Sequence, residues 1–329
     1  MGEHVASRPI DDGYVAIGWG EMGDLRQYID RDALKSALSS HYPDKKPGAL
    51  PVDAGTLFRF SRDIREGDIV IYPSKHDRMV NIGRFVGEYF YVPDDRDEYP
   101  NHRRVHWLGS WPRNSFSQSA LNEIGSFITL FSVREHVSEF LERIGQVVPE
   151  AGPSTDDEEL EATDDDTATV AVSRQAELTT ADFVIRQIFT KLSGYEFEDL
   201  VAHLLECMGY TARVTQRSGD GGVDVIAHRD KLGFEPPILK VQCKRKTDQI
   251  PRPEVDQLLG TLGEGEYGLF IALGSFSRQS IELERNRPKL RLIDGEQFVT
   301  LLLEHYGQLA PRYRSIIPLK HIYVPDLQS

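Results

Sequence analysis

Three polar side chains in the second half of the sequence have the types and spacing of a metal-assisted hydrolytic site. Asp224 stands at the start of an apolar segment, in SGDGGVDVIA, and Gln242 and Lys244 stand two residues apart in ILKVQCKRK. Because side chains alternate between the two faces of a strand, Gln242 and Lys244 are expected on one face. A carboxylate, an amide oxygen and an ammonium group placed together suit hydrolysis of a phosphodiester by a bound divalent cation.

The expected roles follow from the chemistry of each group. Asp224 would hold the cation, which polarises the phosphate and lowers the pKa of a bound water. Gln242 would supply a neutral oxygen ligand or position the water, and the backbone carbonyl of Cys243 is a further candidate ligand. Lys244 would orient the water and offset the charge of the transition state. Hard oxygen ligands without a nearby histidine or cysteine cluster favour Mg²⁺, with Mn²⁺ as a substitute.

Glu198 is a second acidic candidate, on a predicted helix that precedes these strands. It follows Phe197 at the edge of the apolar stripe of that helix. Two interpretations stay open from the residues alone. Glu198 is a solvated helix residue, which its position favours, or it is a second acidic partner for the metal.

The elements that must position these residues alternate between helix and strand. Apolar spacing predicts amphipathic helices over 179–194 and 195–210. Further strands and helices follow in the order strand 211–216, strand 223–227, strand 237–243, a helix after Pro253, strand 267–274, helix 277–286, strand 290–293 and helix 296–307. This order predicts an α/β domain over 177–329, with a mixed central sheet flanked by helices.

The first half of the chain has a different pattern. Apolar, β-branched and aromatic residues between Gly, Asp and Pro breakers predict short strands over 13–19, 67–73, 79–92 and 103–109. Helices are predicted over 30–41, 117–123 and 133–144. Residues 1–148 are therefore expected to form a small closed β structure with flanking helices, and the whole chain is expected to be an α+β protein of two domains.

The segment between the two domains, 149–176, combines Pro, Gly, Ser and Thr with a dense acidic run and is predicted to be a disordered linker. A plain solubilising spacer is the favoured interpretation, and an acidic strand that occupies a nucleic-acid channel at rest is the alternative. Nine acids and no base lie within 150–166, so only −5 of the net charge of −14 belongs to the rest of the chain. The net charge is therefore a weak argument against a nucleic-acid partner.

Length and composition limit the protein's class. A chain of 329 residues is long enough for two cores, and no apolar run approaches the roughly 18 residues of a membrane span. The N-terminus lacks the pattern of a signal peptide, and the only cysteines are Cys207 and Cys243. These features predict a soluble protein of the reducing cytoplasm, without a membrane partner or a four-cysteine zinc site.

Six sequence blocks in the second half resemble the catalytic domain of the Mrr family, restriction enzymes that act on methylated DNA. They cover about 195–303 in the family's order and are FEDLVAHLLECMGY, SGDGGVDVIA, VQCKRK, PEVDQLLG, GLFIALGSFS and LIDGEQFVTLL. The resemblance implies a restriction-endonuclease-like fold of the PD-(D/E)XK type, in which Gln242 replaces the usual Glu of the last motif. It implies Asp224, Gln242 and Lys244 as catalytic residues, with Glu198, and less certainly Asp220, as acidic helpers.

Residues beside this centre are candidates for contacts with the DNA backbone. Between 240 and 252, five bases face a single acid, Asp248, which makes the segment locally basic. The predicted DNA-binding residues are Arg245, Lys246, Arg252, Arg217 and Ser275. For each of these charged side chains a solvated surface is the competing interpretation, and capping of the following helix is the alternative for Ser275.

The N-terminal half resembles the PUA-like superfamily, including EVE-type domains, over most of 13–131. The resemblance lies in IREGDIVIYPSKHDRMVNIGRFVGEYFYV, with GYVAIGWGEMGDL before it and HRRVHWLGSW after it. It implies a β-barrel that reads a modified base by flipping it into an aromatic pocket. Candidate lining residues are Trp19, Tyr72, Tyr89, Tyr91, Trp107 and Trp111, with Arg103 and Arg104 as phosphate contacts. The competing interpretation is that most of these aromatic side chains fill the barrel core.

Together these expectations predict a modification-dependent DNA endonuclease, with a reader over 1–148, a linker over 149–176 and a nuclease over 177–329. Its partner would be double-stranded DNA that carries modified bases. A homodimer is expected on DNA, because cutting both strands requires two active sites. Two alternatives stay open: an antiphage effector nuclease whose N-terminal domain senses a small ligand, and a DNA-binding protein without catalysis.

Overall fold

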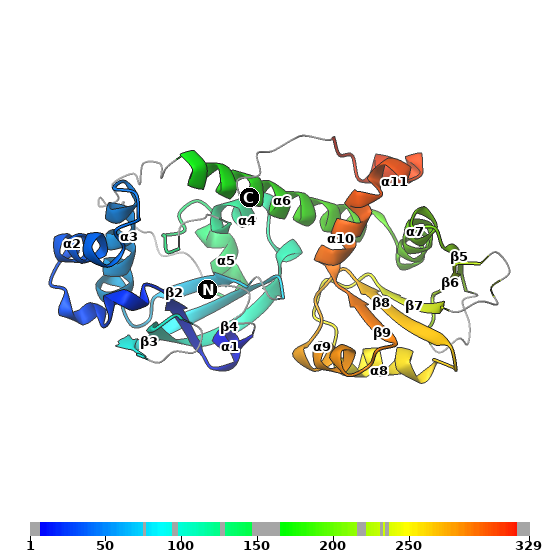
Figure 1. Ribbon diagram of the computed structural model, residues 1–329, viewed down its shortest axis with the longest axis horizontal. Helices are drawn as coiled ribbons and strands as arrows, with labels where there is room; N and C mark the ends of the chain where they lie inside the picture. Colours follow the sequence, from blue (N-terminus) through cyan, green and yellow to red (C-terminus); the bar gives the residue numbers. More distant parts are fainter. Residues whose placement is uncertain are drawn as a thin grey trace. The chain divides into compact units, whose positions relative to one another are not determined.

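The computed structural model describes residues 7–74, 77–93, 98–125, 129–146, 165–215, 222–230, 233 and 237–320, with the backbone alone over 165–175. The chain divides into two compact units between Leu178 and Thr179 (Figure 1). No helix among the described residues has the length and apolar composition needed to span a membrane.

The N-terminal unit contains a curled antiparallel sheet of four strands in the order β1-β4-β3-β2. The strands are β1 (Tyr14–Ile17), β2 (Ile69–Pro73), β3 (Met79–Tyr91) and β4 (Asn101–Pro112). The helices are α1 (Arg8–Asp11), α2 (Arg31–His41), α3 (Ala49–Phe58), the π-helix η4 (Arg59–Asp63), α4 (Gln118–Ile124), α5 (Val137–Arg143) and the short 3-10 turns η2 (Gly20–Met22), η3 (Leu25–Gln27) and η5 (Arg113–Ser115). β1 and β2 are the edges of this sheet, and closure into a PUA-like barrel stays a prediction.

One predicted helix of this unit begins later than the sequence indicated. The prediction covered 133–144, whereas α5 begins at Val137. The carboxylate of Glu123 accepts the backbone N–H groups of 134–136 at 2.6 to 3.0 Å. Glu123 thus holds the segment that precedes α5, and the prediction of helix over 133–136 was wrong.

A second correction concerns the predicted linker. The helix α6 spans Asp165–Lys191, so its first twelve residues belong to the segment 149–176 that was predicted to be disordered. The sequence from Asp165 to Lys191 contains neither Pro nor Gly and has four alanines, and such a composition favours helix. The acidic run over 150–164 lies outside the described residues.

The C-terminal unit has a mixed sheet, as predicted, and its five strands lie in the order β5-β6-β7-β8-β9. The strands are β5 (Thr211–Val214), β6 (Val225–His228), β7 (Ile238–Lys244), β8 (Glu266–Ala272) and β9 (Leu290–Ile293). β5, β6 and β7 pair antiparallel, and β7, β8 and β9 pair parallel. The helices after α6 are α7 (Gly194–Cys207), α8 (Arg252–Gly260), α9 (Arg278–Arg285), α10 (Gly295–Glu304), the 3-10 turn η6 (Tyr306–Gln308) and α11 (Pro311–Ile316).

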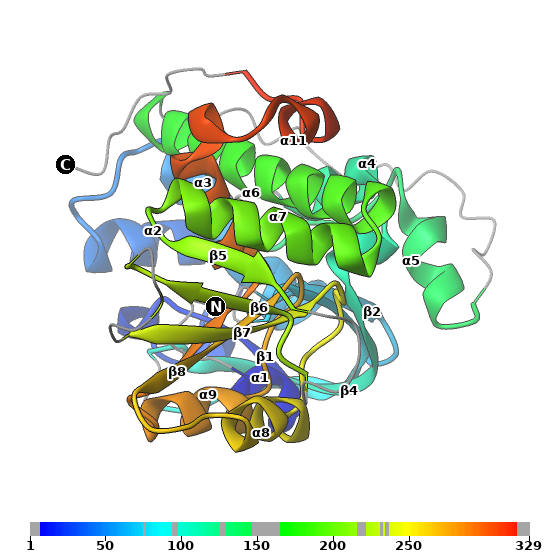
Figure 2. The same cartoon turned by 90° about the vertical axis from the view of Figure 1, so that its right-hand side faces the viewer.

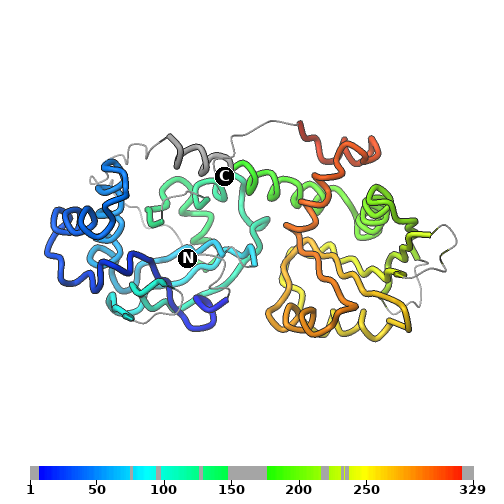
Figure 3. The backbone as a smooth tube through the Cα atoms, in the orientation of Figure 1, coloured from blue at the N-terminus to red at the C-terminus, as the bar shows by residue number. Residues whose placement is uncertain are grey.

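Helices cover both faces of this sheet. One core cluster joins α6, α7, α10 and α11 to Val241 and Cys243 of β7, and a second joins α8 and α9 to Phe270 and Ala272 of β8. Figure 2 places α7 on one side of β5 to β8 and α8 and α9 on the other. Figure 3 traces the chain through the two crossovers, from β7 through α8 to β8 and from β8 through α9 to β9. Parallel neighbours require such crossovers.

Candidate active site

Asp224 reaches across from the start of β6 to β7. Its backbone N–H donates to the carbonyl of Val241 at 2.8 Å, and its Oδ2 accepts the backbone N–H of Cys243 at 2.7 Å. Cys243 lies between Gln242 and Lys244, so the Asp224 carboxylate is fixed against the segment that carries both residues. The structure therefore brings together the three residues that the sequence singled out.

The backbone around Asp224 is also held by hydrogen bonds from Thr215, on the side of β5. Thr215, which follows β5, donates its backbone N–H to the Asp224 carbonyl at 2.9 Å and its hydroxyl to the Val223 carbonyl at 2.7 Å. Burial raises the pKa of the Asp224 carboxyl group, while the Cys243 N–H and the Lys244 charge oppose that rise. The ionised carboxylate is thus incompletely compensated, and a bound cation would stabilise it further.

Gln242 has an unsatisfied oxygen. The side chain is 2% exposed, and its Oε1 has no hydrogen-bond partner among the described residues. Gly222 packs against the amide, and a Cβ at that position would lie 3.1 Å from Gln242 Nε2. A buried carbonyl oxygen without a partner costs about 1–3 kcal/mol. A divalent cation bound beside Asp224 would supply such a partner, so this oxygen suits the role of a metal ligand.

The two faces of β7 carry different side chains, as period two predicts. Val241 and Cys243 lie in the core cluster beneath α7. Gln242 pairs in register with Phe270, whose side chain lies in the cluster beneath α8 and α9. Gln242 and Lys244 therefore belong to the face that α8 and α9 cover.

Glu254 in the first turn of α8 joins this site, and the sequence analysis did not include it. Its Oε2 lies 3.8 Å from Lys244 Nζ, and its Oε1 lies 3.3 Å from Lys246 Nζ. The carboxylate thus holds two ammonium groups beside Gln242. The matching block PEVDQLLG contained Glu254, but only the fold of the preceding loop brings it to Lys244.

We expect Glu254→Gln to slow cleavage about tenfold, the usual cost of losing a group that orients an active-site residue. The stability should change by less than about 1 kcal/mol, because the pair is half-exposed. Single-turnover cleavage and thermal denaturation measure the two effects. Glu266→Gln is the matched control, because it breaks the comparable Lys240–Glu266 pair of 2.8 Å at the far end of β7. Equal cleavage by both variants would contradict this role of Glu254.

Glu198 lies on α7, which begins with a capping box between Ser193 and Glu196. Burial raises the pKa of the Cys243 thiol well above its ordinary value, and the charges of Asp224 and Glu198 add to that rise. Both carboxylates therefore act on the same point of β7, and a direct role of Glu198 at a metal stays a prediction. No group of three His, Cys, Asp or Glu side chains suited to a metal occurs in the described parts of the chain.

Arg245 is partly buried against the end of α6. Its guanidinium donates to the carbonyl of Phe189 and lies 4.9 Å from the centre of the Phe189 ring. Since Arg245 follows Lys244, alternation directs it to the opposite face, where α6 packs. Arg245 therefore anchors α6, and its role as a phosphate contact stays a prediction.

The other predicted DNA-binding residues differ in their burial and in their partners. Lys246 pairs with Glu254, and Arg252 pairs with Asp256 at 3.3 Å. Ser275 is 7% exposed, and among the described residues its hydroxyl has no hydrogen-bond partner. It does not cap α9, because Ser277 does so. Arg217 and Asp220 lie outside the described residues.

The aromatic residues proposed for a base pocket do not share one face of the N-terminal sheet. A register shift in the pairing of β3 with β4 leaves Leu108 unpaired, between the pairs Gly83–Trp107 and Ile82–Gly109. Trp107 packs with one core cluster and Trp111 with another. Trp111 therefore does not complete a pocket with Trp107, because the extra residue reverses the alternation.

Among the remaining aromatic candidates, Tyr72 is the neighbour of Trp107, with ring centres 6.1 Å apart. Trp19 and Tyr91 pack, partly buried, against the same cluster as Trp107. Tyr89 is 4% exposed, and its hydroxyl donates to Asn101 Oδ1 at 2.7 Å, which makes it a core residue.

The two predicted phosphate contacts of this unit differ. Arg103 is 3% exposed and donates to the carbonyl of Phe60 at 2.6 Å. It stabilises the π-helix and cannot reach a phosphate, so that prediction is corrected. Arg104 is exposed, with its guanidinium 5.4 Å from the centre of the Phe90 ring.

Comparison with known proteins supports the division into two units. Residues 189–302 match a family described as restriction endonuclease, and residues 2–133 match a family described as a domain of unknown function. The chain is 31% identical over 177 residues to the Type IV methyl-directed restriction enzyme EcoKMrr of Escherichia coli strain K12. The match covers 52% of this chain and 57% of that protein, so the chain spans little more than half of this relative. The predicted resemblance to Mrr is confirmed.

Two solved structures overlap the chain in part. One is the MspJI restriction endonuclease in complex with a 27-mer oligonucleotide, at 17% identity and a TM-score of 0.34, covering 72% of this chain and 58% of that one. The other is the DNA modification-dependent restriction endonuclease AspBHI, at 14% identity and a TM-score of 0.33, covering 76% and 66%. With scores this low, the fold assignment rests on the strand order and the family match.

Proposed function

We propose that the protein is a modification-dependent DNA endonuclease that hydrolyses phosphodiester bonds with a divalent metal ion. The observation that carries this proposal is the arrangement around Cys243. Its N–H fixes the Asp224 carboxylate, and beside it lie the buried, unpartnered Gln242 Oε1 and the Lys244 ammonium group. The family match of residues 189–302 supports the same reaction class.

Asp224 and Gln242 would hold the metal ion through a carboxylate and an amide oxygen, with the Cys243 carbonyl and Glu198 as further candidate ligands. When bound, Mg²⁺ or Mn²⁺ supplies Lewis acidity toward the phosphate. Lys244 positions the attacking water and offsets the negative charge that develops on the phosphate. Glu254 keeps Lys244 at the site. The residues thus share one electrostatic task, which is to stabilise added charge at the scissile phosphate.

The N-terminal unit is proposed to be the reader of modified bases, with a PUA-like barrel. Its candidate pocket is reduced to Tyr72 and Trp107, with Trp19 and Tyr91 in the same cluster, because Trp111 packs elsewhere and Tyr89 is core. The proposed partner is double-stranded DNA that carries modified bases. Two copies of the chain would act together, because each active site cuts one strand.

A cleavage panel tests this proposal. Duplexes of one sequence carry cytosine, 5-methylcytosine, 5-hydroxymethylcytosine or N6-methyladenine and are incubated with Mg²⁺, Mn²⁺ or EDTA. We expect at least one modified duplex to be cut about tenfold faster than the plain duplex, a discrimination typical of one base-pair change. EDTA should stop cleavage, and added metal should restore it. Equal rates on all duplexes would refute the reader, and no cleavage with any metal would refute the nuclease.

A further inference from the structure

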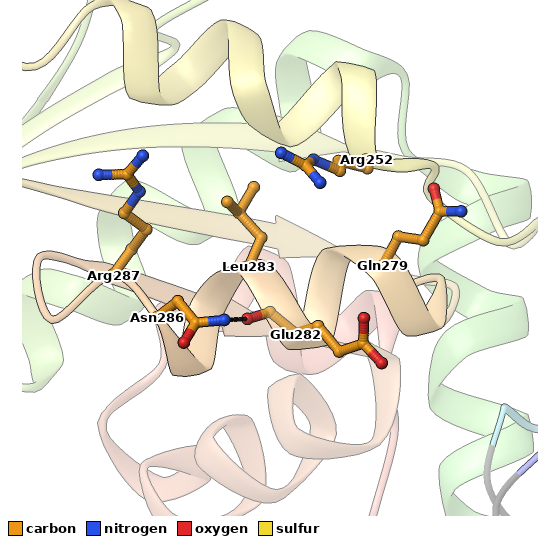
Figure 4. A pocket seen from close by; sticks show the side chains of 6 residues that line it. All are labelled: Arg252, Gln279, Glu282, Leu283, Asn286 and Arg287. Atoms are coloured by element: carbon orange, nitrogen blue, oxygen red, sulfur yellow. Dashed lines mark hydrogen bonds between the residues drawn. The ribbon is translucent and has the colours of Figure 1, made fainter.

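A pocket of about 310 Å³ lies between α8 and α9 (Figure 4). These two helices cover the face of the sheet to which Gln242 and Lys244 belong. One lining residue, Arg252, begins α8, and the others come from α9 and the two residues after it. They are Gln279, Glu282, Leu283, Asn286 and Arg287.

The charged groups in this pocket are not neutralised equally. Among the described residues no acid pairs with Arg287, whereas Arg252 has Asp256 at 3.3 Å. The one acid of the lining, Glu282, is engaged by Arg278 at 3.1 Å outside the pocket. In Figure 4 the guanidinium groups of Arg252 and Arg287 flank the side chain of Leu283, between the two helices. The pocket therefore contains one guanidinium group without an acid partner among the described residues, that of Arg287, beside the paired guanidinium group of Arg252.

The wider surface here is basic in a chain whose net charge is −14. Residues 278–291 contain five bases and two acids. Both acids are occupied, since Glu282 binds Arg278 and Glu284 binds Arg291 at 3.2 Å. Three bases of this segment have no acid partner within the described residues: Arg285, Arg287 and Lys289. A local excess of unpaired bases attracts a polyanion whatever the net charge of the chain.

We propose that this pocket binds a phosphate of the DNA backbone, so that the duplex extends from the cleavage site across α8 and α9. Two guanidinium groups and the Gln279 amide are donors suited to phosphate oxygens. Small organic ligands favour pockets lined mainly by apolar and aromatic side chains, and here Leu283 is the only apolar lining residue. With no aromatic lining residue to hold a base, the phosphate rather than a nucleoside is recognised. This inference rests on DNA as the proposed substrate.

The test is the salt dependence of DNA binding by the full chain, measured by fluorescence anisotropy of a labelled duplex in EDTA. Arg287→Ala should reduce the slope of log K against log salt by about 1, because one phosphate contact is lost. At ~0.15 M salt the affinity should fall roughly fivefold, as the same relation requires. Arg287→Lys should keep the slope. Arg285→Ala is the matched control, because it makes the same change two residues away at a residue that does not line the pocket.

An equal loss for Arg287→Ala and Arg285→Ala would overturn the proposal, because it would indicate a diffuse field rather than a site. So would an unchanged slope for Arg287→Ala. Titration of the protein with ATP and with inorganic phosphate tests whether the pocket binds a small phosphate ligand instead of DNA. If either binds at micromolar concentration and requires Arg287, while DNA binding does not, the pocket belongs to a small ligand.

The outcomes separate this inference from the nuclease proposal. If the wild-type protein cuts DNA and the Arg287→Ala slope equals the wild-type slope, the pocket alone is refuted. If no metal supports cleavage but the slope depends on Arg287, the pocket stands and the nuclease is refuted.

Discussion

Asp224→Asn is expected to slow DNA cleavage at least about 10³-fold, the order of loss seen when a principal electrostatic group is removed from an active site. Asparagine keeps the shape of the side chain and an oxygen that accepts the Cys243 N–H, now 2.7 Å from Oδ2. It loses the negative charge that would hold the metal. The fold should therefore persist while the reaction fails.

Single-turnover cleavage with saturating Mg²⁺ measures this effect, and anisotropy measures DNA binding. Binding should be unchanged or tighter, because the substitution removes a negative charge near the phosphate. Asp199→Asn is the control, since it makes the same change at an exposed position of α7. A rate within tenfold of the wild type for Asp224→Asn would remove Asp224 from the catalytic centre.

The second large effect is expected from Gly274→Ala, which should destabilise the C-terminal unit by about 3 kcal/mol. Gly274 follows β8 and is buried against the loop after β7. A Cβ there would overlap the carbonyl oxygen of Asp248 and lie 2.7 Å from that of Thr247. Both are backbone atoms, so the loop itself must move. The Lys244 carbonyl, which accepts the Leu273 N–H at 3.2 Å, would be disturbed with it.

Chemical denaturation, followed by circular dichroism, gives the free energy of unfolding, and cleavage should fall in the same variant. Gly260→Ala is the matched control. It closes α8, and a Cβ there meets nothing within 4 Å. Because alanine favours helix, that variant should be neutral or slightly more stable. If the Gly274→Ala protein is as stable as the control, the prediction is wrong, and the loop that contains Thr247 and Asp248 moves without loss of stability.

The placement of Asp224, Gln242 and Lys244 beside one another could be predicted from the sequence because it depends on short-range geometry. Gln242 and Lys244 share a face through strand alternation, and Asp224 lies on the adjacent strand of a sequential pair. The same alternation places Arg245 on the opposite face, where it binds Phe189. The position of Arg245 on that face could therefore have been predicted from the sequence, where charge alone suggested a DNA contact.

Other features depend on contacts that periodicity does not encode. Glu254 reaches Lys244 only through the course of the loop between β7 and α8. In the N-terminal unit, the unpaired Leu108 reverses the alternation of β4, so Trp107 and Trp111 enter different cores. An inserted residue of this kind leaves no mark in a pattern of apolar and polar positions. The sequence analysis predicted a disordered linker over 149–176 from its acidic composition. It therefore missed the first twelve residues of α6, whose helix propensity is high.

One edge of the C-terminal sheet, formed by β5, has a consequence for solution behaviour. β5 is an edge strand of four residues, and Thr211, Arg213 and Val214 are exposed on it. Exposed edges invite another chain to add as a further strand, and short strands that carry a charge discourage such addition. We therefore expect the brevity of β5 and the charge of Arg213 to discourage strand addition at the edge that lies next to Asp224.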